Sequence, residues 1–371
     1  MTNRPGRGWL RTLVAAVLLA ALAATAFAQD EDWAAIEAAA KEEGTLVVYS
    51  TTSRTEVAAA AFTELTGIQV EVTRLGEQDL IQRAYQEARA GARNVDMIVV
   101  EDWVAARELL SATGYFVNYV PPTARTTFAP EYTDPLVLGF INRVFGYNTE
   151  LHAEDPFTNV WQLTMPEFRG RVMIRDLAIT GEHQNAFTEW VRRSDELEAA
   201  YTELTGEPLV MTEANAGLEF IKRFLENDAI IMTSDTRIAE AIGARGQEAP
   251  PYGVFYVYSK HRDIPLQDLA LAESRNIGPT LGYYYPIVLQ LAADARHPNA
   301  AKVFMEYLGT LDGFAPWADS PGVYTPNPAQ VPFEGDMPWA WWAERLWGYD
   351  LDFAAQHRGE VLDTWLKYAQ R

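Results

Sequence analysis

Cysteine is missing from the sequence, which has 371 residues. Its absence excludes disulfide bonds and thiolate metal sites, so the fold must rest on its apolar core. A chain of this length is typical of two domains. Histidines are few and too scattered in the sequence to predict a histidine-rich metal cluster; they are residues 152, 183, 261, 297 and 357.

Positive charge is scarce as well. The chain has 30 Lys and Arg against 51 Asp and Glu, which gives a formal net charge of −21. Such a field repels nucleic acids and anionic lipids, so we expect no nucleic-acid partner. It mildly favours cationic ligands, although a local pocket can override it.

Long apolar runs are absent beyond the N-terminus, where a membrane span would need about 18 such residues. The N-terminus combines a basic stretch, residues 1–11, with an apolar stretch, residues 12–24, and the pattern Ala-Phe-Ala ending at Ala28. This arrangement predicts a secretory signal peptide, residues 1–28, and a mature protein exported to the periplasm. The alternative is a retained N-terminal anchor.

Strand-like and helix-like segments alternate along the first third of the chain. Such alternation predicts parallel βαβ units and a doubly wound sheet. The expected strands are 45–50, 68–75, 95–102, 136–149, 170–176, 229–235, 249–260 and 283–293. The expected helices include 32–44, 53–67, 80–91, 103–114, 297–314 and a Trp-rich region, 337–370, and a turn-rich break is expected at 120–135.

Several segments, taken in order, resemble those of a known family. They are GTLVVYSTTS, VDMIVVEDW, VFGYNTEL, WQLTMPEFRGRVMIRD, TSDTRIAEAIGARG and RHPNAAKVFMEYLGTLDGF. The pattern resembles the extracellular solute-binding proteins of ABC importers, and in particular the group similar to ferric-iron-binding periplasmic proteins. The resemblance covers nearly all of residues 44–325.

The resemblance implies an α/β fold, a two-lobed periplasmic-binding-protein clamshell in which each lobe is a doubly wound mixed sheet with two interlobe crossings. Lobe 1 would comprise residues 29–138 with 285–325, and lobe 2 residues 139–284 with 326–371. It also implies a monomer without cofactor or catalytic activity, which captures a small molecule or metal ion and delivers it to the membrane subunits of an ABC permease. Closure around the ligand would be a hinge motion.

Candidate ligand contacts lie where strands turn into helices, because open α/β sheets bind ligands beyond the carboxyl ends of their strands. Thr51 and Thr52 follow the first strand, at a helix N-terminus suited to an anion. Ser53 and Glu56 fit a capping box, so we assign Ser53 mainly to capping.

Two further junctions carry acidic candidates. Asp102 and Trp103 follow a buried strand, and they either contact ligand or cap and pack the next helix. Thr180 and Gly181 match a small-residue turn that cradles an anion in the ferric-binding relatives. Glu182 departs from that pattern, because a carboxylate there would repel an anion and could instead bind a cation, or simply favour the helix dipole.

Another junction offers Ser234, Asp235 and Arg237. Arg237 could pair with a carboxylate or phosphate, or Asp235 could cap the helix while Arg237 is solvated. Tyr256 and Tyr258 lie roughly where the ferric-binding relatives carry their paired tyrosines. Strand spacing points both to one face, so they could ligate iron or form aromatic core.

Three consecutive tyrosines, Tyr283, Tyr284 and Tyr285, are predicted at the second interlobe crossing. Neighbouring strand residues face opposite ways, so the three cannot all hold one ion. Tyr283 and Tyr284 are kept as candidate cleft contacts.

The ligand has three candidate classes. Ferric iron or an iron chelate is the first hypothesis, from the resemblance and the Tyr256/Tyr258 pair. A small organic or phosphorylated anion would use Thr51, Thr52 and Arg237. An organic cation such as a polyamine would use Glu101, Asp102, Glu182 and nearby aromatics. The rival classes are an exported hydrolase, although no G-x-S-x-G or H-E-x-x-H motif occurs, and a sensor domain.

Overall fold

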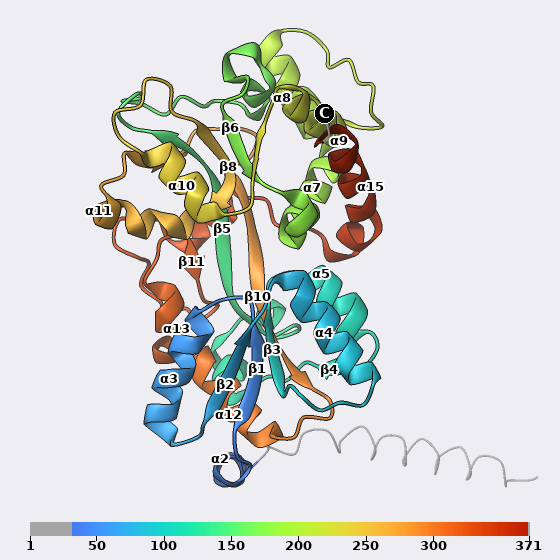
Figure 1. The fold of residues 1–371 in the computed structure, drawn as a ribbon, viewed down its shortest axis with the longest axis vertical. Coiled ribbons are helices and arrows are strands. Elements are labelled where there is room, and N and C mark those ends of the chain that lie inside the picture. The colour runs from blue at the N-terminus through green and yellow to red at the C-terminus, as the bar shows by residue number, and fades with distance from the viewer. Residues whose placement is uncertain (1–31, 370–371) are drawn as a thin grey trace, which may run out of the picture.

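Two α/β lobes, joined by shared strands, make up the part of the protein seen in Figure 1. The computed structural model describes residues 32–369, so the predicted signal peptide lies outside the described residues. Within 32–369, none of the helices combines the length and the apolar character that a membrane crossing needs. The two-lobed α/β architecture expected from the sequence is confirmed.

Lobe 1 contains the first three strands, which run parallel in the order β2-β1-β3. β1 and β3 are short, mainly apolar runs and are almost wholly buried, whereas β2 is polar and only half-buried. The strands are β1 (Leu46–Ser50), β2 (Val70–Arg74), β3 (Met97–Val100) and β4 (Phe116–Val117). The helices are α2 (Trp33–Glu42), α3 (Arg54–Thr66), α4 (Glu77–Arg89), α5 (Trp103–Ala106), α6 (Pro122–Thr127), α12 (Pro298–Gly309) and α13 (Leu311–Ala318).

Lobe 2 contains a second set of strands and a second group of helices. In this lobe β6 lies between β7 and β8 and runs parallel to both. The strands are β6 (Val172–Arg175), β7 (Ile230–Met232), β8 (Tyr252–Val257) and β9 (Leu271–Glu273). The helices are α7 (Gly181–Arg192), α8 (Ser194–Thr205), α9 (Ala216–Glu226), α10 (Asp235–Gly243), α11 (Ile264–Gln267) and α15 (Leu351–Ala369).

Two long strands connect the lobes. They are β5 (Val137–Asn148) and β10 (Gly282–Ala292), and Figure 1 shows both running from one lobe into the other. They pair antiparallel, β10 also pairs with β3 of lobe 1, and β5 also pairs with β8 of lobe 2. A single sheet therefore passes through both lobes, in the order β2-β1-β3-β10-β5-β8-β6-β7.

Some element boundaries differ from those expected. The helix expected at 297–314 is divided into α12 and α13, because Thr310 is extended and its hydroxyl accepts a hydrogen bond from the Gly313 N–H as an N-cap. The turn-rich break contains α6, which begins with a proline at its first position. The expected C-terminal helix is two helices, α14 (Trp339–Ala343) and α15, and the short β11 (Val323–Tyr324) pairs with β5.

Candidate functional site

A cavity of about 470 Å³ lies between the lobes. Its walls come from the carboxyl ends of β1, β3 and β6, from the start of α4 and from the start of α7, as expected for an α/β sheet. We call it the interlobe cavity. Its lining residues are Thr51, Leu75, Gly76, Glu77, Gln78, Asp79 and Glu101 of lobe 1, and Arg175, Ile179 and Glu182 of lobe 2.

The lobe 1 wall of this cavity carries two neighbouring carboxyl groups, Glu77 and Glu101. Glu77 Oε1 accepts hydrogen bonds from the backbone N–H of Glu101, at 3.1 Å, and of Asp102, at 3.0 Å. Glu77 Oε2 is buried without a hydrogen-bond partner. Glu101 Oε1 accepts a hydrogen bond from the Thr51 hydroxyl at 3.2 Å. Among residues 32–369, neither carboxyl group forms an ion pair.

The same wall shifts the pKa of both carboxyl groups upward. Burial, followed by the negative charges of Glu101 and Asp102, raises the pKa of Glu77 well above its usual value. Burial and the nearby charge of Glu182 raise the pKa of Glu101 to about 7. Burial disfavours the charged form because it removes solvating water, and the neighbouring negative charges disfavour it by repulsion. Both carboxyl groups therefore bind a proton more readily than an ordinary glutamate does.

The lobe 2 wall carries two carboxyl groups that are paired. Arg143, on the hinge strand β5, donates to Glu182 at 2.8 Å and to Asp235 at 2.7 Å. Arg175 adds a second contact to Asp235 at 3.2 Å. Burial alone would raise the pKa of Asp235, but Arg143 and Arg175 outweigh it and hold that pKa below its usual value. The two arginines are thus balanced by two acids.

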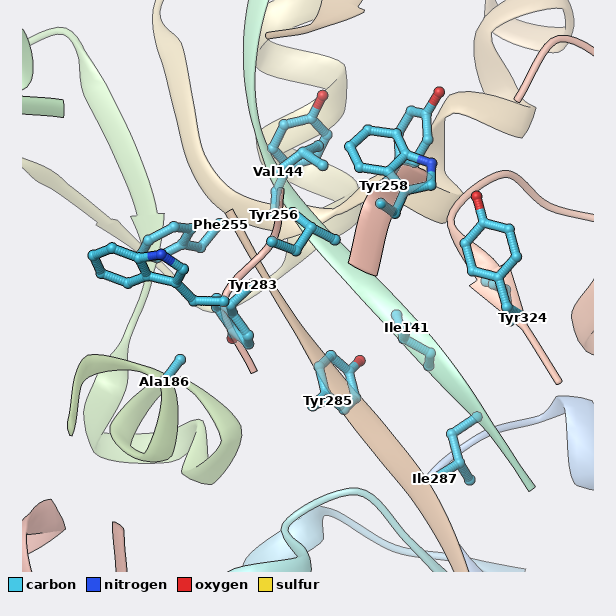
Figure 2. Close-up of a cluster of buried hydrophobic side chains, with 14 of the residues drawn as sticks. Ile141, Val144, Ala186, Phe255, Tyr256, Tyr258, Tyr283, Tyr285, Ile287 and Tyr324 are labelled. Carbon is cyan, nitrogen blue, oxygen red and sulfur yellow. The ribbon is translucent and has the colours of Figure 1, made fainter. Parts of the chain in front are cut away.

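The three consecutive tyrosines alternate, as predicted for a strand. The Tyr283 hydroxyl lies 2.5 Å from His183 Nδ1, and Figure 2 shows Tyr283 beside Phe255 and Ala186. Tyr285 lies further along β10, with its ring 5.5 Å from Arg143 Cζ. Tyr284 faces the opposite side and packs against aromatic rings, Phe140 and Trp339. The three side chains do not converge on one point.

Tyr256 and Tyr258 lie away from the interlobe cavity. Both rings contact His261, and the Tyr256 hydroxyl lies 2.5 Å from His261 Nε2. Figure 2 places the two tyrosines near one another, at the end of the cluster away from Ile287. Burial, followed by the charge of Glu273, raises the pKa of both phenols. They form aromatic core here, and within 32–369 no group of three or more His, Asp or Glu residues is arranged to hold a metal ion.

The threonine and serine candidates after β1 have separate roles. Thr51 lines the interlobe cavity, whereas the Thr52 hydroxyl accepts a hydrogen bond from the Arg54 N–H at 3.3 Å. Ser53 makes no side-chain capping bond to α3, so the expected capping box is wrong. The reason is local: Ser53 already has helical backbone angles, φ −66 and ψ −14, which are not those of an N-cap.

The junction before α10 also differs from the expectation. Ser234, and not Asp235, caps the helix, because its hydroxyl accepts a hydrogen bond from the Arg237 N–H at 3.4 Å. Asp235 turns inward to the two arginines. Arg237 is exposed and lies outside the interlobe cavity.

The candidates at α5 and α7 meet each other across the lobes. Asp102 caps α5 by accepting a hydrogen bond from the Ala105 N–H at 3.2 Å, which confirms the structural interpretation of this residue. It lies directly against Gly181, leaving no room for a Cβ atom there. Thr180 precedes Gly181, and its buried hydroxyl has no partner within the described chain. Trp103 is buried, and with Tyr284 it lines a second cavity of about 510 Å³ on the other side of the hinge.

Five polar residues at or near the cavity were missed from the sequence: Glu77, Gln78, Asp79, Arg143 and Arg175. Arg143 could have been found, because it is the one charged residue in the 12-residue β5, and a buried charge must be paired. Arg175 ends β6 and so satisfies the rule applied to Asp102. Glu77 opens α4 after β2, which gave no such signal because β2 is a polar, half-buried strand.

The geometry can be compared with known proteins. A family model described as bacterial extracellular solute-binding protein matches residues 57–344. The chain belongs to this family. Its members are the solute-binding components of ABC importers, and they work outside the cytoplasmic membrane. No curated protein matches the sequence.

Several solved structures have the same fold as this chain. Iron-bound HitA from Pseudomonas aeruginosa is 17% identical, with a TM-score of 0.68, covering 88% of this chain and 99% of that one. AfuA from Actinobacillus pleuropneumoniae, solved with fructose-6-phosphate, is 17% identical, with a TM-score of 0.66 and the same coverage. The ferric binding protein from Campylobacter jejuni is 15% identical, with a TM-score of 0.64, covering 87% of this chain and 99% of that one. These likenesses establish the fold.

Proposed function

We propose that this solute-binding protein captures a small organic cation in its interlobe cavity and delivers it to the membrane subunits of an ABC importer. The observation that carries the proposal is the imbalance of charge in the cavity. Glu77 and Glu101 lack a basic partner, and Asp79 adds a third acid on the same wall. The basic groups nearby, Arg143 and Arg175, are already engaged by acids.

A bound ammonium group supplies the charge that this wall lacks. It would replace the protons held by Glu77 and Glu101 and give the unpartnered Glu77 Oε2 a donor. The cavity, at about 470 Å³, is of a size that suits a small molecule. The proposal predicts that binding releases protons into the solvent at neutral pH.

The other two ligand classes have less support. The tyrosine pair proposed for ferric iron, Tyr256 and Tyr258, is buried against His261 rather than in the cavity. Of the groups proposed for an anion, Arg237 is exposed elsewhere, and Thr51 already donates its hydroxyl proton to Glu101. An anion in the cavity would also face the carboxyl groups of lobe 1.

Thermal unfolding with a ligand panel tests the proposal. The panel contains linear polyamines, a quaternary ammonium compound, ferric citrate and a sugar phosphate. A ligand present at about 1,000 times its Kd stabilises the fold by roughly 4 kcal/mol, so the right class is readily seen. We expect stabilisation by a polyamine or ammonium compound, and its loss in Glu101→Gln and Glu77→Gln.

Glu64→Gln serves as the matched control, because Glu64 is an exposed glutamate of α3 away from the cavity. It should retain full ligand stabilisation. Stabilisation by the sugar phosphate alone, or by ferric citrate with a tyrosinate absorption band, would overturn the organic-cation proposal and support one of the other classes.

Export is proposed on the N-terminal sequence. We infer that residues 1–28 direct secretion to the periplasm and are then removed. Intact mass measurement of the periplasmic protein should give a chain beginning at Gln29. A full-length chain in the membrane fraction would instead identify a retained anchor.

A further inference from the structure

The C-terminal helix α15 contacts both lobes. It packs along α7 and α9 of lobe 2 and also touches α5 of lobe 1. Figure 1 shows α15 beside α7, near the level where the two lobes meet. This helix lies beyond residues 57–344, the part that matches the family model.

An ion pair between Arg358 and Asp102 forms the centre of this contact. Arg358 Nη1 lies 3.1 Å from Asp102 Oδ1, and Nη2 lies 2.8 Å from Oδ2, so the pair is bidentate. Asn185 of α7 donates a further hydrogen bond to Asp102 Oδ1 at 2.9 Å. The Asp102 side chain is only 2% exposed and that of Arg358 18%. We call Asp102, Arg358 and Asn185 the interlobe latch.

Two smaller contacts support the latch. Arg107, one turn beyond Asp102, donates to Asp352 at 2.8 Å and to the Leu351 carbonyl at 3.2 Å. Near the cavity, Gln78 Nε2 donates to the Ala178 carbonyl at 3.2 Å. All of these groups belong to lobe 1 on one side and to lobe 2 on the other.

The latch is buried only while the lobes touch. Asp102 lies against the bare backbone of Gly181, and its carboxylate is satisfied by groups of lobe 2 and by the α5 backbone. If Arg358 were absent, the closed arrangement would leave this carboxylate buried and without its cation, which is unfavourable. Separation of the lobes would return Asp102 to water. The identity of residue 358 therefore biases the balance between closed and open lobes.

We propose that Arg358 is a positioning residue that holds the two lobes together through Asp102, even without ligand, and so controls ligand exchange. The inference rests on the proposed capture of solute between the lobes, although its test requires no ligand. A stronger latch lowers the fraction of molecules whose lobes are apart, and so slows any ligand entry or release that requires the lobes to separate.

The absence of cysteine makes a direct test practical. Cysteines introduced by Leu65→Cys in α3 and Val210→Cys in lobe 2 are the only labelling sites, and both side chains are well exposed, at 72% and 74%. Electron spin resonance then gives the distance distribution between the two labels in the ligand-free protein. We expect a narrow distribution for the labelled parent and a longer, broader one in Arg358→Met and in Asp102→Asn.

The two substitutions should not add, because they break the same pair. The double variant is expected to have the distribution of either single variant. Lys367→Met is the matched control, because Lys367 lies on the same helix but pairs with Glu213 inside lobe 2. It should leave the distribution unchanged. Small-angle scattering of the unlabelled variants checks that the radius of gyration rises in the same order.

A distribution in Arg358→Met that matches the labelled parent would overturn the proposal, and so would an equal change in Lys367→Met. If Arg358→Met fails to fold, Asp102→Asn and Arg107→Ala replace it as the test. Asn at position 102 can still cap α5, and Arg107 lies outside the buried pair, so both variants should fold. Unchanged label distances in both would refute the latch. These outcomes are independent of the ligand panel, so a failed latch and a failed ligand assignment remain distinguishable.

Discussion

The two walls of the interlobe cavity use the same kind of side chain in opposite ways. On the lobe 2 side, Glu182 in the wall and Asp235 behind it are both paired with Arg143, at 2.8 Å and 2.7 Å. On the lobe 1 wall, Glu77 and Glu101 receive only neutral donors, namely backbone N–H groups and a threonine hydroxyl. The two sides of the cavity therefore differ in the partners of their carboxyl groups, which are cationic on the lobe 2 side and neutral on the lobe 1 side. The proposed cationic ligand would supply the positive charge that the lobe 1 wall lacks.

The largest loss of stability is expected on the lobe 2 side of the cavity, where the carboxyl groups are paired with arginine. Arg143→Met removes the shared partner of Glu182 and Asp235, and leaves two buried acids with only Arg175 at the edge. Loss of one partner from a buried ion pair costs about 3–5 kcal/mol. Denaturant unfolding should show a fall of this size. Arg89→Met, at an exposed site on α4, should change the free energy of unfolding by no more than about 0.5 kcal/mol. An equal loss of stability in Arg89→Met would show that the effect of Arg143→Met does not depend on the buried ion pairs.

A substitution on the lobe 1 wall is expected to raise the stability of the fold rather than lower it. The folded pKa of Glu101, about 7, lies above the usual carboxyl value of 4.5. The folded state therefore binds a proton more tightly, and this carboxyl group costs stability increasingly as pH rises from 4.5 through 7. Glu101→Gln cannot ionise and should be more stable than the parent at pH 8 by about 1–3 kcal/mol.

That gain should shrink as the pH is lowered through 7 and approach zero below about 4.5, where Glu101 is mostly protonated in both the folded and the unfolded state. Thermal unfolding between pH 5 and 8 measures it. Glu182→Gln is the counterpart on the paired wall and should lose stability at pH 8, since it leaves Arg143 with one acid fewer. If Glu101→Gln and Glu182→Gln both stabilised the fold at pH 8, the two walls would not differ in the way described.

The affinity for a cationic ligand should rise with pH. A cation binds the ionised form of Glu101, so affinity is expected to rise between pH 6 and 8, by up to about tenfold per unit for each proton released. Calorimetry in buffers of different ionisation enthalpy counts these protons. A flat profile, or the same rise in Glu101→Gln, would assign the pH dependence to another group.

The smallest effect is expected at Arg237, which the sequence offered as an anion contact. It is exposed and outside the interlobe cavity, so Arg237→Ala should change ligand affinity less than twofold. Its effect on stability should be within about 0.5 kcal/mol. A large loss of affinity would show that the cavity extends to the start of α10.

The fold was accessible from the sequence because its signals are local. Buried runs such as 46–50 and 97–100, followed by helices that end at glycines like Gly67, identify βαβ units without reference to the rest of the chain. The resemblance then supplied the two lobes. The C-terminal helices were harder to separate, because the Trp-rich segment around residues 339–343 is apolar throughout.

The site was only partly accessible, because its chemistry depends on pairs far apart in the chain. Thr51 and Glu182 could be proposed from strand ends, and both line the cavity. The partner of Glu182 is Arg143, 39 residues away and on a different kind of element. For Asp235 the sequence left ligand contact and helix capping open, because it cannot show that Ser234 caps the helix while the acid turns inward to the arginines.

The strands β5 and β10 belong to both lobes, and this limits how the gene can be divided into fragments that fold. A gene fragment that encodes one lobe would cut a 12-residue buried strand or deprive it of its partner on the sheet. The exposed strand edge that results invites aggregation. We therefore expect that neither lobe expressed alone forms a stable, soluble domain.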